Sequence, residues 1–400
     1  MVPRGGRTSE PAPLPRIFCI RAPEQLSGVK AAPRALAPGS VALVHDYLNQ
    51  RGGAERVALE LARMWPGAPL YTSLYRPAST FPEFADIDVR PSRLDRVPID
   101  AGFRALAPLY PLAFRDLGPL REELVISSSS GWAHGVRTAP GVTHIVYCHT
   151  PARWLYRSDE HLGRTAGALM LGPLKPSLRR WDRRAAARAS VYVANCREVR
   201  ERIRQIYGRE AAVVYPPVDV DRFTARPRGE RLLVISRLLP YKRVELVVRT
   251  ATRAGIGLDV VGTGPTAGAL RRNAGPTVAF HGRIDDRALI ELIEGCRGLC
   301  VAATEDFGIV PIEANAAGKP VAAFAAGGAL ETITDGVNGA LFHELTEESL
   351  LDAIERLDQL ETSPEALRES AGRYSVHNFN RRFGAVVARA LERPRLEAPE

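Results

Sequence analysis

Short apolar runs alternate with amphipathic helical patterns along most of this chain, and this alternation constrains the fold more than any other feature. The first run is SVALVHDYL at 40–48, and AERVALELARMW at 54–65 follows it with apolar residues at helical spacing. Further strand-length runs are APLYTSLY, ELVISSSS, THIVYCHTP and SVYVANC. Strands that alternate with helices form parallel sheets through right-handed crossovers. The pattern therefore predicts an α/β fold.

The alternation is interrupted near the middle of the chain. Pro216 and Pro217 end an apolar run, and the polar stretch TARPRGE at 224–230 precedes a new strand-like run, RLLVIS. Such a polar, turn-rich stretch is typical of a domain boundary. The strand-like runs LDVVG, TVAFHG, GLCVAA, PVAAF and GALF follow. We predict two Rossmann-like βαβ domains, at 41–225 and 226–375, that face each other across a cleft.

The two ends of the chain differ from these domains. Residues 1–40 are rich in Pro, Ala and Gly without any period, which predicts a disordered extension. Residues 376–400 are expected to form a C-terminal helix that packs back toward the N-terminal domain.

Composition narrows the classes of partner. The net charge of +9 is compatible with nucleic acid, an anionic membrane surface or phosphorylated ligands. No zinc-finger spacing or RNA-binding signature is present, so nucleic acid is not expected as a partner. The five cysteines are scattered and odd in number, which favours a reducing, cytoplasmic compartment. No apolar run reaches the ~18–20 residues that span a bilayer.

The stretch TEDFGIVPIEANAAGKPV at 304–321 carries two carboxylates beside a helix start. Glu305 follows the predicted strand GLCVAA, and Glu313 falls in the first turns of the helix that Pro311 begins. Backbone amides from Gly308 to Val310 form an anion site at the helix N-terminus. Carboxylates accept hydrogen bonds from paired hydroxyls. The combination indicates a nucleotide sugar, and the alternative is that both glutamates only stabilise the helix N-terminus.

A basic pair follows the first strand of the second half. Arg237 and Lys242, in SRLLPYKR, are expected in a loop at a strand's carboxyl end, facing the cleft. A planar guanidinium and a point charge together suit a diphosphate. The alternative is a solvated basic loop.

Two further turns of the second half are candidates for the donor pocket. Gly262 and Gly264, in VVGTGP, form a tight turn from strand to helix, which we interpret as lining the donor cleft. The backbone around Arg283 and Ile284, in HGRIDD, is placed to contact the edge of a base.

The first half supplies candidates for the acceptor side. HDYLNQRGGAERV begins with His45 and Asp46 and places Gly52 and Gly53 at a helix start, ready for a phosphate or a sugar. His149, in YCHTPARWLY, is predicted at a strand end facing the cleft. A purely structural histidine is the alternative.

These motifs, in this order, resemble the retaining GT-B glycosyltransferases of the glycogen-synthase-like superfamily, also called group 1 or family 4 glycosyltransferases. The resemblance covers about 41–391. Ser236 stands where a glycine commonly precedes the arginine, which leaves the basic clamp intact. ISSSSGWAHGV, YCHTPARWLY and GGALET look most like the mannosyltransferases that build bacterial surface polysaccharides.

The resemblance implies transfer of a hexosyl group, with mannose favoured, from a nucleotide-diphosphate sugar to a glycan or lipid-linked acceptor. GDP-mannose is the favoured donor, and no cofactor or metal is expected. Arg237 and Lys242 would hold the diphosphate, Glu305 the transferred sugar and Glu313 the ribose. Amides of Phe307, Gly308, Ile309 and Val310 would complete the donor pocket, while Gly53 and His149 would face the sugar and acceptor.

Other functions fit parts of the pattern. A glycoside hydrolase would also use two carboxylates, but the basic pair has no purpose on a neutral glycan. A sugar-nucleotide epimerase would need no acceptor, and a non-catalytic nucleotide-binding module is a further alternative. The DxD tripeptides at 86–88 and 219–221 lie away from the donor motifs and are interpreted as structural.

Contact with a membrane surface is a separate hypothesis. FRALAPLYPLAF at 103–114 mixes aromatic residues and leucines, and LRRWDRRAAAR at 178–188 carries five arginines on a predicted helix. Basic residues beside apolar ones suit an anionic membrane. The alternative is a solvated helix face over an ordinary core.

Overall fold

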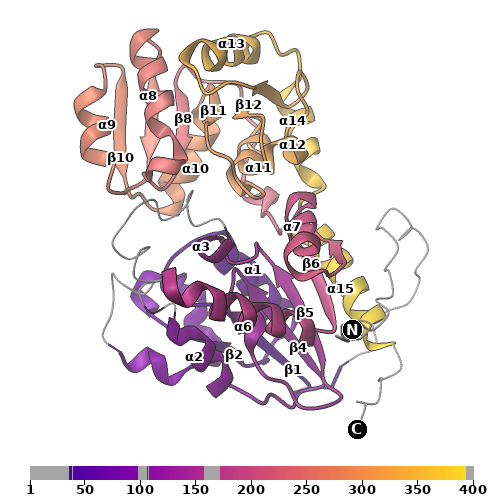
Figure 1. The fold of residues 1–400 in the computed structure, drawn as a ribbon. Coiled ribbons are helices and arrows are strands. Elements are labelled where there is room, and N and C mark those ends of the chain that lie inside the picture. The colour runs from indigo at the N-terminus through magenta and orange to yellow at the C-terminus, as the bar shows by residue number, and fades with distance from the viewer. Residues whose placement is uncertain (1–35, 38, 98–105, 107, 157–171, 393–400) are drawn as a thin grey trace, which may run out of the picture.

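The computed structural model describes residues 36–37, 39–97, 106, 108–156 and 172–392. Two parallel sheets form two domains, one above the other in Figure 1, as the alternation of strands and helices predicts. Nearly all of the predicted extension at 1–40, and the end of the chain from 393, lie outside the described residues.

The sheet of the first domain has seven strands in the order β3-β2-β1-β4-β5-β6-β7. Every neighbouring pair is parallel, so helices make the crossovers. The strands are β1 (Val41–His45), β2 (Leu70–Thr72), β3 (Val89–Pro91), β4 (Leu124–Ser129), β5 (Thr143–Cys148), β6 (Val191–Ala194) and β7 (Ala211–Val213). The helices are α1 (Gly53–Met64), α2 (Tyr110–Asp116), α3 (Arg153–Tyr156), α6 (Lys175–Arg188) and α7 (Arg197–Tyr207).

The sheet of the second domain has six strands in the order β10-β9-β8-β11-β12-β13, again all parallel. The strands are β8 (Leu232–Ile235), β9 (Leu258–Val261), β10 (Val278–Gly282), β11 (Gly298–Val301), β12 (Val321–Phe324) and β13 (Gly339–Phe342). The helices are α8 (Val244–Arg253), α9 (Ala267–Asn273), α10 (Asp286–Gly295), α11 (Ile309–Ala316), α12 (Ala329–Thr332), α13 (Glu347–Asp358) and α14 (Pro364–Gly372).

Each apolar run named in the sequence contains one of these strands, because a strand buried on both faces needs a nearly continuous apolar run. The strand that no such run predicted is β3, whose three residues are half-buried or exposed. Edge strands need less apolar surface because one side faces solvent.

Both sheets start at an inner strand and run first to one edge and then to the other. The direction in which successive strands are added to the sheet therefore reverses between β1 and β4 in the first sheet and between β8 and β11 in the second. Ligands of open α/β sheets bind at such a reversal, outside the carboxyl ends of the strands. The loops after β8 and β11 carry Arg237, Lys242 and Glu305 of the predicted donor site.

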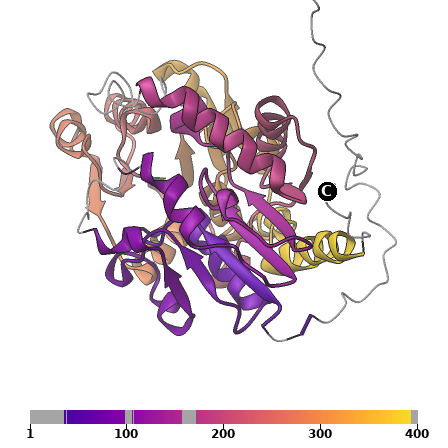
Figure 2. The ribbon, with the colours of Figure 1, turned by 60° about the horizontal axis from the view of Figure 1, so that its bottom comes forward.

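The last helix, α15 (Val376–Leu391), follows the second domain in sequence but packs on the first. The rings of Phe379 and Phe383 lie 5.7 and 5.9 Å from the ring of Tyr147 on β5. Figure 2 shows this helix, in yellow, beside the strands of the first sheet. The chain thus crosses between the domains twice.

The first crossing is held by a buried lysine. Lys319, which follows α11, is fully buried, and its Nζ donates to the carbonyl oxygens of Arg226 and Pro227 at 2.9 and 2.5 Å. These carbonyls belong to the segment that connects β7 to β8.

Among the described residues, no helix is long and apolar enough to cross a membrane.

Candidate functional site

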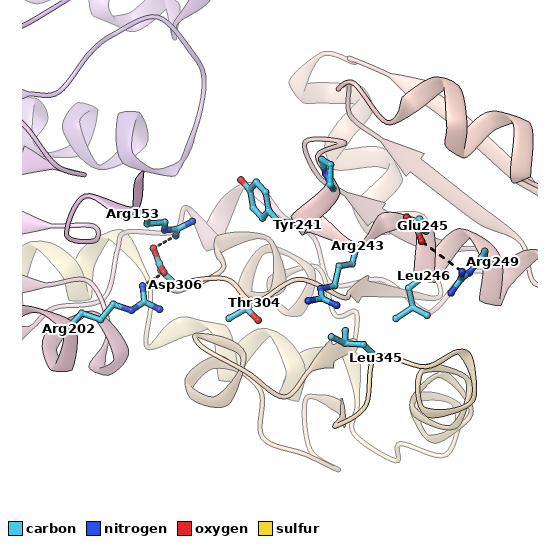
Figure 3. Close-up of a pocket in the computed structure, with 11 residues that line it drawn as sticks. Arg153, Arg202, Tyr241, Arg243, Glu245, Leu246, Arg249, Thr304, Asp306 and Leu345 are labelled. Atoms are coloured by element: carbon cyan, nitrogen blue, oxygen red, sulfur yellow. Dashed lines mark hydrogen bonds and ion pairs between the residues drawn. The ribbon is translucent and has the colours of Figure 1, made fainter. Parts of the chain in front are cut away.

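A cleft of about 710 Å³ opens between the two domains (Figure 3). The first domain contributes residues from α3 and α7, and the second contributes the loops after β8 and β11 together with α8. The lining residues are Arg153, Arg202, Pro240, Tyr241, Arg243, Glu245, Leu246, Arg249, Thr304, Asp306 and Leu345. Four of these are arginines against two acidic residues, so the cleft favours an anionic ligand.

Asp306 joins the two domains at one end of this cleft. Its carboxylate pairs with Arg153 from α3 and with Arg202 from α7 (Figure 3). The side chains of Asp306 and Arg202 are only 11% and 10% exposed, so water screens this contact weakly. The Sγ of Cys196 also donates to the backbone oxygen of Asp306, at 3.0 Å. The loop after β11 is therefore held against the first domain.

The predicted basic pair lies at the reversal point of the second sheet. Lys242 ends a short 3₁₀ turn, Pro240–Lys242, within the loop that follows β8. Its Nζ pairs with Oε1 of Glu305, so two of the predicted site residues, 63 positions apart, are in contact. Arg237 is exposed, and its guanidinium donates to the hydroxyl of Tyr241 at 3.3 Å.

The sequence places the start of this helix at Pro311, and α11 begins two residues earlier, at Ile309. Gly308 is its N-cap, with φ of 85° and ψ of 89°, a conformation that a side chain opposes. Ile309 and Val310 are the first helical residues, so their amides belong to the free amides of the helix start. Ile309 also touches the first domain, because a Cβ placed on Gly53 would lie 2.8 Å from its Cδ1.

Glu313, predicted to bind ribose, is buried and faces the first domain. Its Oε1 accepts a hydrogen bond from Arg56 of α1 at 3.1 Å. The contact from Gly53 to Ile309 and the pair from Arg56 to Glu313 bring the start of α1 against α11. Gly52 is the N-cap of α1, and Gly53 is its first residue, as predicted.

The two glycines of VVGTGP occupy positions where the neighbouring backbone leaves no room for a side chain. A Cβ on Gly262 would lie 1.8 Å from the carbonyl oxygen of Ser236, and one on Gly264 would lie 2.2 Å from that of Leu238. The close approach is to the chain's own backbone around Arg237, so these glycines support the basic turn. Their placement as lining of the donor cleft stays a prediction.

The remaining donor candidates lie around the same sheet edge. Arg283 is exposed, and Ile284 is half-buried against the core. The ring of Phe307 is buried and stacks on Tyr215 at 5.4 Å, so only its backbone can serve a ligand. The placement of a base at Arg283 and Ile284 stays a prediction.

The acceptor-side candidates lie at the strand ends of the first sheet. His149 follows β5, and its Nε2 lies 2.8 Å from the Oγ of Ser128. Burial, and secondarily His45, lowers the pKa of His149 to about 3. The ring is therefore neutral at neutral pH and serves as a hydrogen-bonding group rather than a cation.

Asp46 differs from the expectation of a group free to meet an acceptor. Its carboxylate accepts backbone N–H groups of Ser130, Trp132 and Ala133, the last two at 3.0 and 2.7 Å. Burial raises the pKa of Asp46, although the neighbouring His45 and these amides oppose the rise. The side chain bridges the loops after β1 and β4 and organises the reversal point of the first sheet.

One aspartate of each DxD tripeptide makes an ion pair. Asp88 pairs with Arg90 at 2.7 Å, and Asp221 pairs with Arg368 at 3.2 Å. Within the described ranges, no group of three or more His, Cys, Asp or Glu side chains is arranged to hold a metal ion.

Sequence reasoning missed Arg153, Arg202 and Asp306. Arg153 follows His149 by four positions, and Asp306 follows Glu305 directly, so proximity to known candidates could have suggested both. Arg202 stands in REVRERIRQIY among other arginines, and nothing local distinguishes it.

The fold and the site define a two-domain α/β protein with an arginine-lined cleft between its domains. The family model of Glycosyl transferases group 1 matches residues 220–374, and that of Glycosyltransferase Family 4 matches residues 51–222. The two matches together cover both domains. The chain belongs to the group 1 glycosyltransferases with the GT-B fold.

Individual relatives agree with this assignment. A D-inositol 3-phosphate glycosyltransferase of Streptomyces griseus is 24% identical over 90% of this chain and 88% of its own length. A GDP-mannose-dependent alpha-(1-6)-phosphatidylinositol monomannoside mannosyltransferase of Mycolicibacterium smegmatis is 30% identical over 48% of this chain and 58% of its own length. The chain therefore aligns with little more than half of that second relative.

Solved structures support the fold. Anabaena Alr3699/HepE, in complex with UDP-glucose, superposes with a TM-score of 0.66 at 19% identity, covering 87% of this chain and 99% of that one. Sucrose-phosphate synthase from Thermosynechococcus elongatus superposes with a TM-score of 0.65 at 17% identity, covering 87% and 98%.

Proposed function

We propose that this glycosyltransferase moves a hexosyl group, with mannose favoured, from a nucleotide-diphosphate sugar to a glycan or lipid-linked acceptor in the cytoplasm. The observation that carries the proposal is the contact of Lys242 with Glu305 at the reversal point of the second sheet. A phosphate-binding cation and a hydroxyl-binding carboxylate lie side by side there, beside the N-terminus of α11.

In this proposal each group acts where negative charge or a hydroxyl must be held. Lys242 has three donors, so it can keep Glu305 and contact the leaving diphosphate together. Arg237 and the amides of Ile309 and Val310 add donors around the same anion. Glu305 accepts from hydroxyls of the transferred sugar, and Glu313 accepts from those of the ribose.

Retention of configuration is proposed through a reaction on one face of the sugar. The leaving diphosphate takes the proton of the acceptor hydroxyl while Arg237 and Lys242 stabilise its charge. We propose that no metal is required. Full loss of activity in EDTA, with recovery on addition of manganese, would contradict that part.

GDP-mannose is proposed as donor because the motifs of the first half resemble mannosyltransferases, and one relative is named as GDP-mannose-dependent. UDP-glucose, bound in a structural neighbour, is the competing donor. A panel of nucleotide sugars, followed by nucleotide release with and without acceptors, decides between them. An epimerase would convert the donor without any acceptor, and a hydrolase would cleave a glycan without any donor.

Peripheral contact with an anionic membrane is proposed for access to a lipid-linked acceptor. Leu109 before α2, Leu112 within α2 and Leu174 before α6 are exposed at 43, 58 and 43%. Arg180 and Arg184 on α6 are exposed as well. Residues 103–105 and 107 of the apolar stretch lie outside the described residues. Co-sedimentation with vesicles that does not depend on anionic lipid would contradict this part.

The basic pair provides the sharpest test of the site. Each side chain should contribute a charge-assisted contact of ~1.5–3 kcal/mol to the diphosphate. Lys242→Ala and Arg237→Ala should therefore each lower kcat/KM by about 10–150-fold. Their double variant should lose less than the sum, because both side chains serve one anion. Arg287→Ala removes an exposed arginine from α10, paired with Glu291, and serves as the control.

The steady-state rates of transfer measure these effects. If the contacts tighten as the diphosphate leaves, kcat falls more than KM rises. Unchanged transfer in both single variants would place the diphosphate elsewhere and remove the proposed donor site.

A further inference from the structure

A buried chain of polar groups leads to His149 from within the first domain. His45 ends β1 and Ser128 lies beside it on β4, because the two residues are paired in the sheet register. The Oγ of Ser128 lies 3.1 Å from Nδ1 of His45 and 2.8 Å from Nε2 of His149. One hydroxyl therefore connects two histidine rings.

The chain continues from His45 to Glu55 on α1. Nε2 of His45 lies 3.8 Å from Oε1 of Glu55, and both side chains are 1% exposed. His45 Nε2 and Glu55 Oε2 are enclosed polar atoms without a hydrogen-bond partner in the described residues. A Cβ on Gly52 would lie 2.7 Å from Glu55 Oε2, so the carboxylate lies directly behind the glycine turn.

The carboxylate of Glu55 determines which atom of each pair donates along this series of groups. A carboxylate only accepts hydrogen bonds, so a neutral His45 ring is favoured with its proton on Nε2, toward Glu55. Its Nδ1 is then bare and accepts the Ser128 hydroxyl proton. Having donated that proton, the Ser128 oxygen accepts from Nε2–H of His149.

We propose that Glu55, His45 and Ser128 act as positioning residues that hold His149 in the tautomer with its proton on Nε2 and a bare Nδ1. The proposal rests on the proposed function, because His149 is the first-domain group expected to face the sugar.

In this tautomer, Nδ1 of His149 can only accept a hydrogen bond. No hydrogen bond within the described residues uses its Nδ1, and this atom is not among the enclosed unpaired atoms. A bare nitrogen accepts from a hydroxyl and gives nothing to a phosphate oxygen. His149 is therefore assigned to a hydroxyl of the sugar or acceptor, and the phosphates are left to the second domain.

The tautomer is measured directly by ¹⁵N NMR of the histidine rings in the full chain at pH 8, with the His149 signal assigned from its loss in His149→Asn. The expected result is a proton on Nε2 and none on Nδ1. This measurement does not depend on activity.

Two variants interrupt this series of hydrogen-bonding groups at different points. Ser128→Ala removes the connecting hydroxyl, and Glu55→Gln lets an amide present either N–H or C=O to His45. In both, the His149 signals should report a mixture of tautomers. Loss of one aligned hydrogen bond to the substrate should lower kcat/KM by about tenfold, with unchanged thermal stability of the Glu55→Gln fold.

The preceding residue of β4 supplies a matched control. Ser127 Oγ lies 2.8 Å from Nε2 of the buried His144, the same distance as in the Ser128 pair. Ser127→Ala removes an equivalent bond from the same strand and should keep both the His149 tautomer and kcat/KM. Equal losses in Ser127→Ala and Ser128→Ala would reduce the chain to a structural role and overturn the proposal.

The tautomer of His149 measured by NMR provides two further tests of the proposal. A proton on Nδ1 of wild-type His149, or a tautomer that neither variant changes, also overturns the proposal. If no nucleotide sugar is consumed by the wild-type chain, the proposed function fails, whereas the NMR result still decides the direction of the proton chain.

Discussion

At the scale of single residues, backbone strain and side-chain pairing identify positions that a list of motifs does not. Arg243 is the only residue other than glycine with positive φ in the described ranges, at 52°. It lines the cleft as the N-cap of α8, directly after Lys242. An L-residue in this region costs roughly 1–2 kcal/mol relative to the right-handed region.

Replacing Arg243 tests the strain. Arg243→Gly and Arg243→Ala both remove the guanidinium, but only glycine relieves the backbone. We expect the glycine variant to be the more stable of the two by about 1 kcal/mol, even though glycine has the more flexible unfolded chain. Urea unfolding monitored by circular dichroism measures the difference. Equal stability would mean that the strain costs nothing at this turn.

At the scale of elements, the start of α7 is held by a contact that comes from elsewhere in the chain. The backbone amides of Arg197 and Glu198, at the start of α7, donate to the carboxylate of Glu331 on α12. An acidic group at a helix N-terminus is favourable. Here it comes from the other domain, so the contact also joins the two domains.

The segment between the domains depends on Lys319 in the same way. Lys319→Met keeps an unbranched side chain of similar length but leaves the carbonyls of Arg226 and Pro227 without this donor. Hydrogen bonds to a charged group are worth about 1.5–3 kcal/mol, and Arg226 and Pro227 are exposed residues whose carbonyls water can reach. We therefore expect a loss of about 1.5–3 kcal/mol in the free energy of unfolding.

Limited proteolysis provides the specific measurement for this variant. Cleavage within 224–230 should become faster in Lys319→Met than in the wild-type chain at a temperature where both are folded. A variant that is less stable overall, yet is cut no faster in this segment, would show that Lys319 supports the core instead of the connection.

At the scale of the whole molecule, the structure is a closed arrangement of two domains. Asp306 with its two arginines, Glu331 at α7, and Glu313 with Arg56 all join the domains across the cleft. The first of these is the most enclosed of the charged contacts at the cleft mouth. We therefore expect it to contribute most to closure.

Asp306→Asn tests closure directly. The amide cannot neutralise Arg153 and Arg202, and the change should cost roughly 1.5–3 kcal/mol of interdomain contact. The radius of gyration from small-angle X-ray scattering should rise. Asp88→Asn breaks an exposed pair inside one domain, worth about 0–1 kcal/mol, and should leave the radius unchanged. An unchanged radius in both variants would contradict the role of Asp306 in closure.

The sequence alone was enough to predict the two parallel sheets, a helix start within two residues of that of α11, and the placement of Glu305 and Arg237 after strand ends. These features depend on local patterns, since buried strands require apolar runs and helix starts require particular residues. The order of motifs such as SRLLPYKR was also enough to predict the family that the comparisons then showed.

Only the tertiary structure decided which side chains meet. No local sequence pattern predicts that Lys242 contacts Glu305, or that Arg202 reaches Asp306, 104 positions away. The same holds for Asp46, whose carboxylate accepts hydrogen bonds from backbone amides of the loop after β4. These contacts depend on strand order and domain closure. Strand order brings distant loops to one sheet edge. The closed arrangement of the domains then places two of the many arginines against the carboxylate of Asp306.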